Sequence, residues 1–155
     1  MRRSEREITD SAGIESFIAG EKIMRVGFND CGEVYIVPVN YGYTVCGGKY
    51  TFYFHGAVAG RKYGLALKSP SVGFEIDGGY ELISAGTACG HSAMYMSVIG
   101  NGVLSVIEDT DEKKAALEYV MKQAAGRTGL EYDNKVLGRT AVFKLDVKTM
   151  SCKAK

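Results

Sequence analysis

Two adjacent cations, Arg61 and Lys62, follow a segment with the pattern of a β-strand that runs into the first turn of a helix. His55 and Gly56 end the strand, and Gly60 directly precedes the cations. The first turn of a helix has unpaired backbone N–H groups and the positive end of the helix dipole, so it suits a phosphate, and the cations add charge-assisted donors. The segment indicates a site for a phosphorylated cofactor. A plain strand-to-helix junction with solvated cations fits the same short pattern.

A proline interrupts the strongly strand-like run that contains Val39, Asn40 and Tyr41. Because Pro38 cannot donate a ladder hydrogen bond, it marks a sheet edge or a bulge, where nearby backbone groups are free to bond a flat polar ligand. The alternative is that Pro38 only protects an edge strand from aggregation. Both interpretations predict an interruption of the sheet at this position.

The chain has two histidines, His55 and His91, and each has a chemical and a structural interpretation. A histidine can donate to a phosphate or move a proton, whereas a capping or packing role is at least as common. No second ligand lies at useful spacing, so the sequence predicts no metal site. Tyr95 and Ser97 share one face of a predicted strand, where they either contact a ring or line a barrel. No nucleophile elbow, paired-carboxylate site or cysteine-protease pattern supports hydrolysis.

The elements that position these residues follow from hydrophobic periodicity. The clearest helix has Asp109 as its N-cap and one apolar stripe. Gly78 and Gly79 fit a hairpin turn between two short strands. The predicted helices span about 10–20, 58–68 and 110–125, and the predicted strands span 23–28, 33–41, 49–54, 71–77, 80–85, 92–107 and 140–147.

Composition limits the class of protein. The 155 residues fit a single domain, 1–155, with a substantial core. Nineteen basic and eighteen acidic side chains leave a net charge of +1, which gives no electrostatic footprint for nucleic acid or an anionic membrane. The apolar stretches are too short to span a bilayer, and the four cysteines form no C-x-x-C pair, so we expect a cytoplasmic protein with reduced thiols.

The order of the elements predicts an α+β fold that is mainly β. A meander, hairpins and a returning C-terminal strand favour a closed antiparallel barrel of six to seven strands with flanking helices. The pattern disfavours a Rossmann-type fold, because strands follow strands where that fold alternates strands with helices.

Several segments, taken in order, resemble one family. Together they look like the pyridoxamine 5'-phosphate oxidase-like split-barrel flavoproteins, and within them the nitroimidazole-resistance branch. The segments are residues 1–10, the proline-broken run 34–41, the segment 52–57 with its Gly60-Arg-Lys62 continuation, and residues 72–77, 95–100 and 139–142.

The resemblance implies a split barrel that forms a homodimer and holds FMN in clefts made by both subunits. By the resemblance, the FMN phosphate would be surrounded by His55, Gly56, Arg61 and Lys62. The isoalloxazine ring would lie along Val39, Asn40 and Tyr41. Ser97 and Val98 would approach the ring from the other subunit. Relatives often carry tryptophan where this chain has His91 and arginine where it has Met96.

The expected function is that of an FMN-dependent oxidoreductase that uses NAD(P)H to reduce a small acceptor such as a nitro-aromatic. His55, Tyr95 or water could supply protons. Pyridoxamine phosphate oxidation ranks lower, because residues 146–155 contain no arginine or histidine for a second phosphate. Two alternatives stay open: a non-catalytic flavin-binding or sensing protein, and a haem-binding split barrel that recruits His55 or His91.

Overall fold

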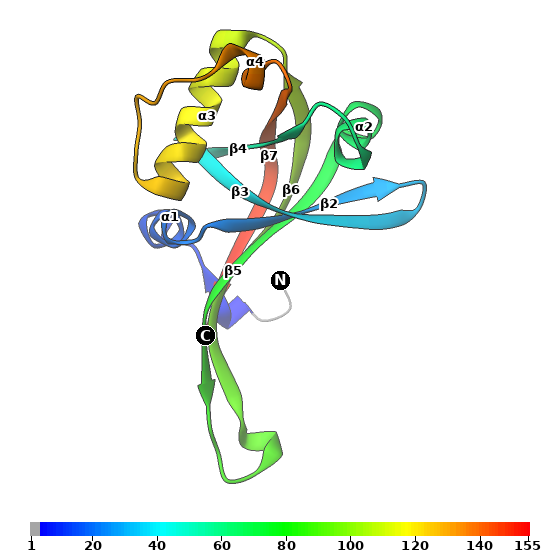
Figure 1. Ribbon diagram of the computed structural model, residues 1–155. Helices are drawn as coiled ribbons and strands as arrows, with labels where there is room; N and C mark the ends of the chain where they lie inside the picture. Colours follow the sequence, from blue (N-terminus) through cyan, green and yellow to red (C-terminus); the bar gives the residue numbers. More distant parts are fainter. Residues whose placement is uncertain (1–3) are drawn as a thin grey trace.

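Seven antiparallel strands form one sheet in the computed structural model, which describes residues 4–155 (Figure 1). The sheet order is β1-β7-β4-β3-β2-β5-β6, and an additional β7–β6 pairing closes it into a ring. The strands are β1 (Glu7–Ile8), β2 (Ile23–Asp30), β3 (Glu33–Cys46), β4 (Lys49–Ala57), β5 (Ser71–Ile83), β6 (Ser92–Ile107) and β7 (Thr140–Ala154). The predicted mainly β split barrel is confirmed. Residues 1–3 of the family-like segment 1–10 lie outside the described residues.

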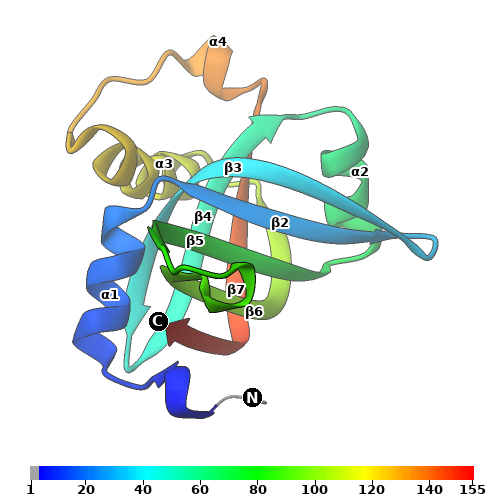
Figure 2. The ribbon, with the colours of Figure 1, turned by 90° about the horizontal axis from the view of Figure 1, so that it is seen from below.

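Four α-helices flank the barrel, with α1 and α3 on one side and α2 on the other (Figure 2). They are α1 (Ser11–Gly20), α2 (Arg61–Lys68), α3 (Thr110–Ala125) and α4 (Asn134–Leu137). The clearest predicted helix, α3, has the predicted bounds, because the Asp109 carboxylate accepts from two backbone N–H groups and Gly126 ends it in the left-handed conformation. The helix expected from 58 begins at Arg61, since β4 continues to Ala57.

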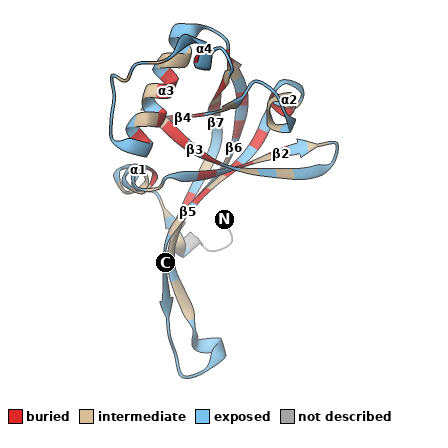
Figure 3. Ribbon diagram, viewed as in Figure 1, coloured by how far each residue is buried: buried red, intermediate tan, exposed pale blue. Residues whose placement is uncertain are grey.

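Buried positions recur along the strands of the barrel (Figure 3), and several of them are aromatic. Phe52, Phe54 and Phe143 are fully buried, and the Phe54 and Phe143 rings stack at 5.0 Å between centroids. Tyr41 is also buried, and its hydroxyl donates to the Ile18 carbonyl oxygen at 2.6 Å. Burial raises the pKa of this phenol, so Tyr41 is a neutral part of the core.

Helix α3 lies against β3 and β4 through a backbone contact at Gly42. A Cβ atom at this position would clash with the backbone of Tyr119 and Val120. The stacked rings of Tyr53 and Tyr119, 5.3 Å apart, add a side-chain contact across the same interface. The absence of a side chain at Gly42 therefore sets how closely α3 covers the sheet.

The barrel is open between β3 and β4. Residues 33–40 of β3 pair with β2 only, and β4 joins β3 from the Tyr41–Phe54 pair onward. Pro38 thus lies on a free strand edge, as its missing donor predicts. We call the gap between β3 residues 33–40 and β4 residues 55–57 the split.

A long hairpin made of β5 and β6 projects from the barrel (Figure 1). The predicted turn at Gly78 and Gly79 is wrong, because β5 continues through both residues to Ile83 with a shift of register between Gly78 and Glu81. Gly79, with φ of 65°, lies in a β-bulge, where β5 has one residue more than β6. The chain does not reverse there. The reversal occurs beyond Ile83, at residues 84–91. We call residues 79–94 the arm.

Candidate functional site

The split brings the proline-broken strand next to the start of α2. Because Tyr41 faces Phe54 in the last β3–β4 pair, Asn40 and His55 are the first residues at which the two strands part. Gly60 precedes the first turn of α2 and has no capping side chain. The predicted phosphate segment and the predicted free edge therefore belong to one region of the fold.

Arg61 is held at the edge of the split by residues of the β2–β3 hairpin. Its Nε donates to Asp30 Oδ2 at 2.7 Å, and a second guanidinium nitrogen lies 2.7 Å from the same oxygen. The guanidinium also lies 4.5 Å from the centroid of the Tyr35 ring. The hydrogen bond to Asp30 raises the Arg61 pKa. The side chain is 47% exposed, which leaves part of its donor fork open to a ligand.

Lys62 lies deeper than Arg61. Its Nζ donates to the His55 carbonyl oxygen at 3.0 Å and lies 5.4 Å from the centroid of the Phe143 ring. Gly56 makes this approach possible, because a Cβ there would come within 2.6 Å of Nζ. Burial lowers the Lys62 pKa, and one backbone acceptor is the only hydrogen bond that the ammonium makes within residues 4–155. An anion would find two unused donors here.

The imidazole of His55 is on the other face of β4. Phe54 and Gly56 face the barrel interior, so the intervening His55 side chain faces outward, where it lines a cavity of about 300 Å³ under α3 and α4. His55 is solvent-exposed on one side, and the partial desolvation on its cavity side, followed by the charge of Lys62, lowers the His55 pKa. The structure thus brings Gly56, Arg61 and Lys62 together and separates the His55 ring from them.

The three residues predicted to run along the flavin ring lie on the free edge of β3 or at its end. The Val39 and Tyr41 side chains are buried, so only their backbone groups can meet a ligand. The Asn40 side chain is exposed and donates to the Lys22 carbonyl oxygen at 3.0 Å. These positions offer backbone hydrogen-bond groups with one polar side chain beside them.

The residues predicted on β6 are remote from the split within one chain. Ser97 pairs with Lys153, near the end of β7. His55 pairs with Val142, near the start of the same strand. The Val98 side chain is fully buried. Tyr95 is next to Lys153, and the Arg6 side chain, followed by Lys153, lowers the Tyr95 pKa.

Two further positions lie toward the arm. His91 is exposed, and its Nδ1 is 2.9 Å from the Thr87 carbonyl oxygen in the turn. Met96 is half-buried beside the barrel core. Neither side chain lines the split.

Sequence reasoning missed the residues that hold Arg61. Asp30 and Glu33 flank the β2–β3 turn, and their carboxylates lie 2.7 and 3.6 Å from Arg61. The predicted strands 23–28 and 33–41 leave residues 29–32 between them, but nothing in this local pattern indicates that Asp30 has a partner 31 residues later in the chain. Between this hairpin and α2 lies an open cavity of about 450 Å³ that includes Arg61 and Lys68.

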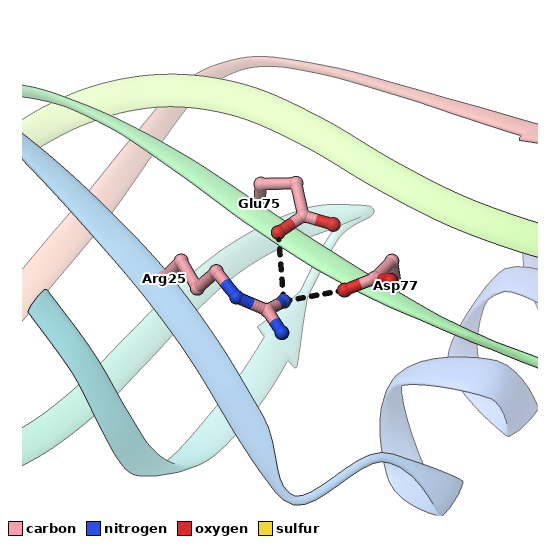
Figure 4. A network of polar contacts seen from close by, with 3 residues as sticks. All are labelled: Arg25, Glu75 and Asp77. Atoms are coloured by element: carbon pink, nitrogen blue, oxygen red, sulfur yellow. Dashed lines mark hydrogen bonds and ion pairs between the residues drawn. The ribbon is translucent and has the colours of Figure 1, made fainter. Parts of the chain in front are cut away.

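A second polar cluster lies on the outer surface of β2 and β5 (Figure 4). Arg25 forms an ion pair with Glu75 at 3.1 Å and another with Asp77. Burial raises the Glu75 pKa, although the bond from Arg25 opposes this shift. These charges satisfy one another, so the cluster adds no free cation to the phosphate region.

Residues 4–155 contain neither a metal-binding cluster nor a membrane-spanning helix. No group of three or more His, Cys, Asp or Glu side chains is placed to hold a metal ion. No helix in this part of the chain has both the length and the apolar character needed to cross a bilayer.

Comparisons with known proteins agree with the fold. The family model described as pyridoxamine 5'-phosphate oxidase matches residues 10–154. A candidate 5-nitroimidazole antibiotic resistance protein from Bacteroides thetaiotaomicron is 28% identical, with a TM-score of 0.82 over 96% of this chain and 86% of that chain. No curated protein matches the sequence.

Two more distant structures share the architecture. The flavocytochrome Anf3 from Azotobacter vinelandii is 20% identical, with a TM-score of 0.82 over 100% of this chain and 72% of that chain. The FAD and haem binding protein from Mycobacterium smegmatis is 16% identical, with a TM-score of 0.84 over 97% and 73%. At these identities the likeness concerns the fold. The match of the family model to nearly the whole sequence shows more: the chain belongs to the pyridoxamine 5'-phosphate oxidase family and resembles its nitroimidazole-resistance branch.

Proposed function

We propose that the protein is an FMN-dependent oxidoreductase with the cofactor phosphate at the start of α2. The observation that carries the proposal is the position of Arg61 and Lys62, which begin a helix directly beside the free edge of β3. A phosphate at this position receives the first backbone N–H groups of α2 and donors from both side chains. Membership of the family supports the choice of flavin.

The residues present fit a phosphate. Gly56 leaves the space that Lys62 Nζ occupies, and among residues 4–155 this nitrogen has only the His55 carbonyl oxygen as a hydrogen-bond partner. Arg61 is held by Asp30 and Tyr35 with part of its fork exposed. Two cations are thus placed before any ligand arrives, which reduces the entropy lost on binding.

The flat part of the cofactor would lie along Val39, Asn40 and Tyr41. Val39 and Asn40 precede the first β3–β4 pair, Tyr41–Phe54, so on the side of the split their backbone groups have no ladder partner. Backbone N–H and C=O groups on a free edge can bond the polar rim of a ring system. Val39 and Tyr41 are fixed by their buried side chains, which keeps this edge rigid.

A second copy of the chain would complete the site. Tyr95 and Ser97 lie remote from the split of their own chain, and the neighbouring arm exposes the apolar side chains of Tyr80, Leu82 and Met94. A homodimer that covers the arm would remove this apolar surface from water and could place Tyr95, Ser97 and the Val98 backbone opposite the ring.

When bound, FMN supplies the redox chemistry, which would take hydride from NAD(P)H and pass electrons to a small acceptor such as a nitro-aromatic. The chain would bind and orient the cofactor and hold protons. Tyr95, whose pKa is lowered by Arg6 and Lys153, is a proton donor at a partly exposed position. The His55 ring is a weaker candidate because it faces away from Lys62 and Gly56.

An absorbance spectrum of the purified protein, followed by FMN titration, tests the proposal. We expect a flavin spectrum and anaerobic bleaching by NADH or NADPH. Bound FMN that neither nucleotide reduces would identify a non-catalytic flavin protein. A Soret band would identify a haem protein. A protein that has no flavin and does not bind added FMN would contradict the proposal.

A further inference from the structure

The His55 imidazole lines a cavity that is separate from the split. The cavity, about 300 Å³ in volume, lies between the outer face of β4 and the helices α3 and α4. Phe54 and Gly56, the neighbours of His55, face the barrel interior, so β4 itself separates this cavity from Lys62. The volume is at the small end of the range of about 300–1,000 Å³ that is typical of ligand pockets.

The walls of the cavity are mainly aliphatic. They are formed by Leu117, Val120 and Met121 of α3 and by Val136 and Leu137 of α4. Aliphatic walls favour an apolar ligand, and a thioether such as that of Met121 makes favourable contacts with aromatic rings. The shape and lining therefore suit a ligand of about one or two rings.

Most polar groups in the lining already have partners within the chain. The Tyr132 hydroxyl donates to Glu118 at 2.8 Å, and the Thr140 hydroxyl donates to the Val136 carbonyl oxygen at 2.9 Å. Asp133 accepts from two backbone N–H groups as the N-cap of α4. Within residues 4–155, only His55 and Glu131 of the lining make no side-chain hydrogen bond. These two are the groups left for a ligand.

The charge of the lining selects among ligands. Glu131 and Asp133 place two carboxylates at the cavity and no cation lines it, so an anionic ligand would be repelled. His55 is solvent-exposed on one side, and its packing on the cavity side, followed by the charge of Lys62, lowers its pKa and so favours the neutral ring. A neutral imidazole offers one nitrogen acceptor and one N–H donor. A hydroxyl group on the ligand can donate to the free ring nitrogen of His55.

We propose that this cavity is a second binding site, which takes a small uncharged aromatic alcohol whose hydroxyl group donates to the His55 ring. The ring of the ligand packs between the α3 and α4 side chains. The inference does not depend on FMN, because the two sites are on opposite faces of β4.

Phenol is the probe, and histidine ring NMR is the measurement. The chain has two histidines, so His91 on the arm is an internal control, and a His55→Gln variant assigns the signals. At pH 7.5 we expect phenol to shift the His55 signal saturably with a Kd on the order of 0.1–1 mM, a value within the range for a ligand of this size. Anisole, which lacks the hydroxyl donor, should bind about tenfold more weakly, and benzoate should not bind.

Two variants test the location. Val136→Trp fills the cavity from a side chain that is 55% exposed and should abolish the shift, whereas Val34→Trp, at a 76% exposed position on β3, should not. The proposal is overturned by a His55 signal that does not move, by equal shifts of His91, or by a shift that persists in Val136→Trp. Displacement of phenol by FMN would overturn it as well, because the cavity would then be part of the flavin site.

Discussion

The barrel body and the arm differ in how far their residues are buried (Figure 3). In the body, the cations near the split have partners in the same chain: Arg61 binds Asp30, and Lys62 binds the His55 carbonyl oxygen. On the arm, Tyr80 is 74% exposed and Leu82 is 53% exposed. A region whose cations are held in place by partners in the same chain can bind the phosphate end of a cofactor without a second chain. A region with uncovered apolar side chains gains stability only when another surface covers it.

The largest effect is expected from removal of both cations in the body. Replacement of Arg61 and Lys62 by alanine should weaken FMN binding by roughly a hundredfold or more, because two charge-assisted contacts are lost together. Fluorescence titration of FMN measures this change. Lys68→Ala, at the far end of the same helix, should alter the affinity by less than about tenfold. Equal effects of the two changes would show that the phosphate does not bind at the start of α2.

The next effect concerns the arm. A glutamate in place of Leu82 would put an unpaired charge into a covered interface, at a cost of about 3–5 kcal/mol to the association. We expect a monomer in analytical ultracentrifugation and weaker FMN binding, with an unchanged thermal midpoint at low protein concentration. Val136→Glu, on α4 at the other end of the molecule, should leave the mass of the assembly unchanged. A dimer that survives Leu82→Glu would place the interface away from the arm.

The same substitution made in both regions gives a third test. Gly42→Ala should lower the free energy of unfolding by about 1–3 kcal/mol or more, because the new methyl group meets the α3 backbone. Gly86→Ala, in the turn of the arm with open space around it, should change it by less than about 0.5 kcal/mol. Urea denaturation measures both variants. A mild effect at Gly42 would mean that α3 can move outward without loss of core packing.

These regions also differ in how far sequence predicts them. The sequence predicts the start of α2 because its signals, two cations after a glycine, are local. It predicts the free edge because Pro38 lacks a hydrogen-bond donor, whatever its neighbours are. It does not predict the Asp30–Arg61 pair, because that pair joins positions far apart in the chain.

Two other features depend on the environment as well as on the local pattern. Gly78 and Gly79 fit a turn and a bulge equally well, and the partner strand β6 decides between them. The outward direction of His55 follows from alternation along β4, but the cavity that it faces exists only because α3 and α4 cover that side. Local sequence predicts which groups are present, and the packing decides which groups meet.

The smallest effect is expected from His55 and concerns acid stability. Burial, together with the charge of Lys62, holds the His55 pKa in the folded protein below its ordinary value of about 6.5. Below this pH the unfolded chain takes up a proton that the folded chain resists, so the free energy of unfolding falls as the pH drops from about 6.5 through the lower folded value. Above this range both states are neutral and His55 has no effect. His55→Gln should therefore reduce the loss of thermal stability between pH 7.5 and 5, while His91→Gln on the arm should retain it, because His55 is still present. The same acid slope in all three proteins would mean that neither the packing on the cavity side of the His55 ring nor the charge of Lys62 lowers the His55 pKa in the native state.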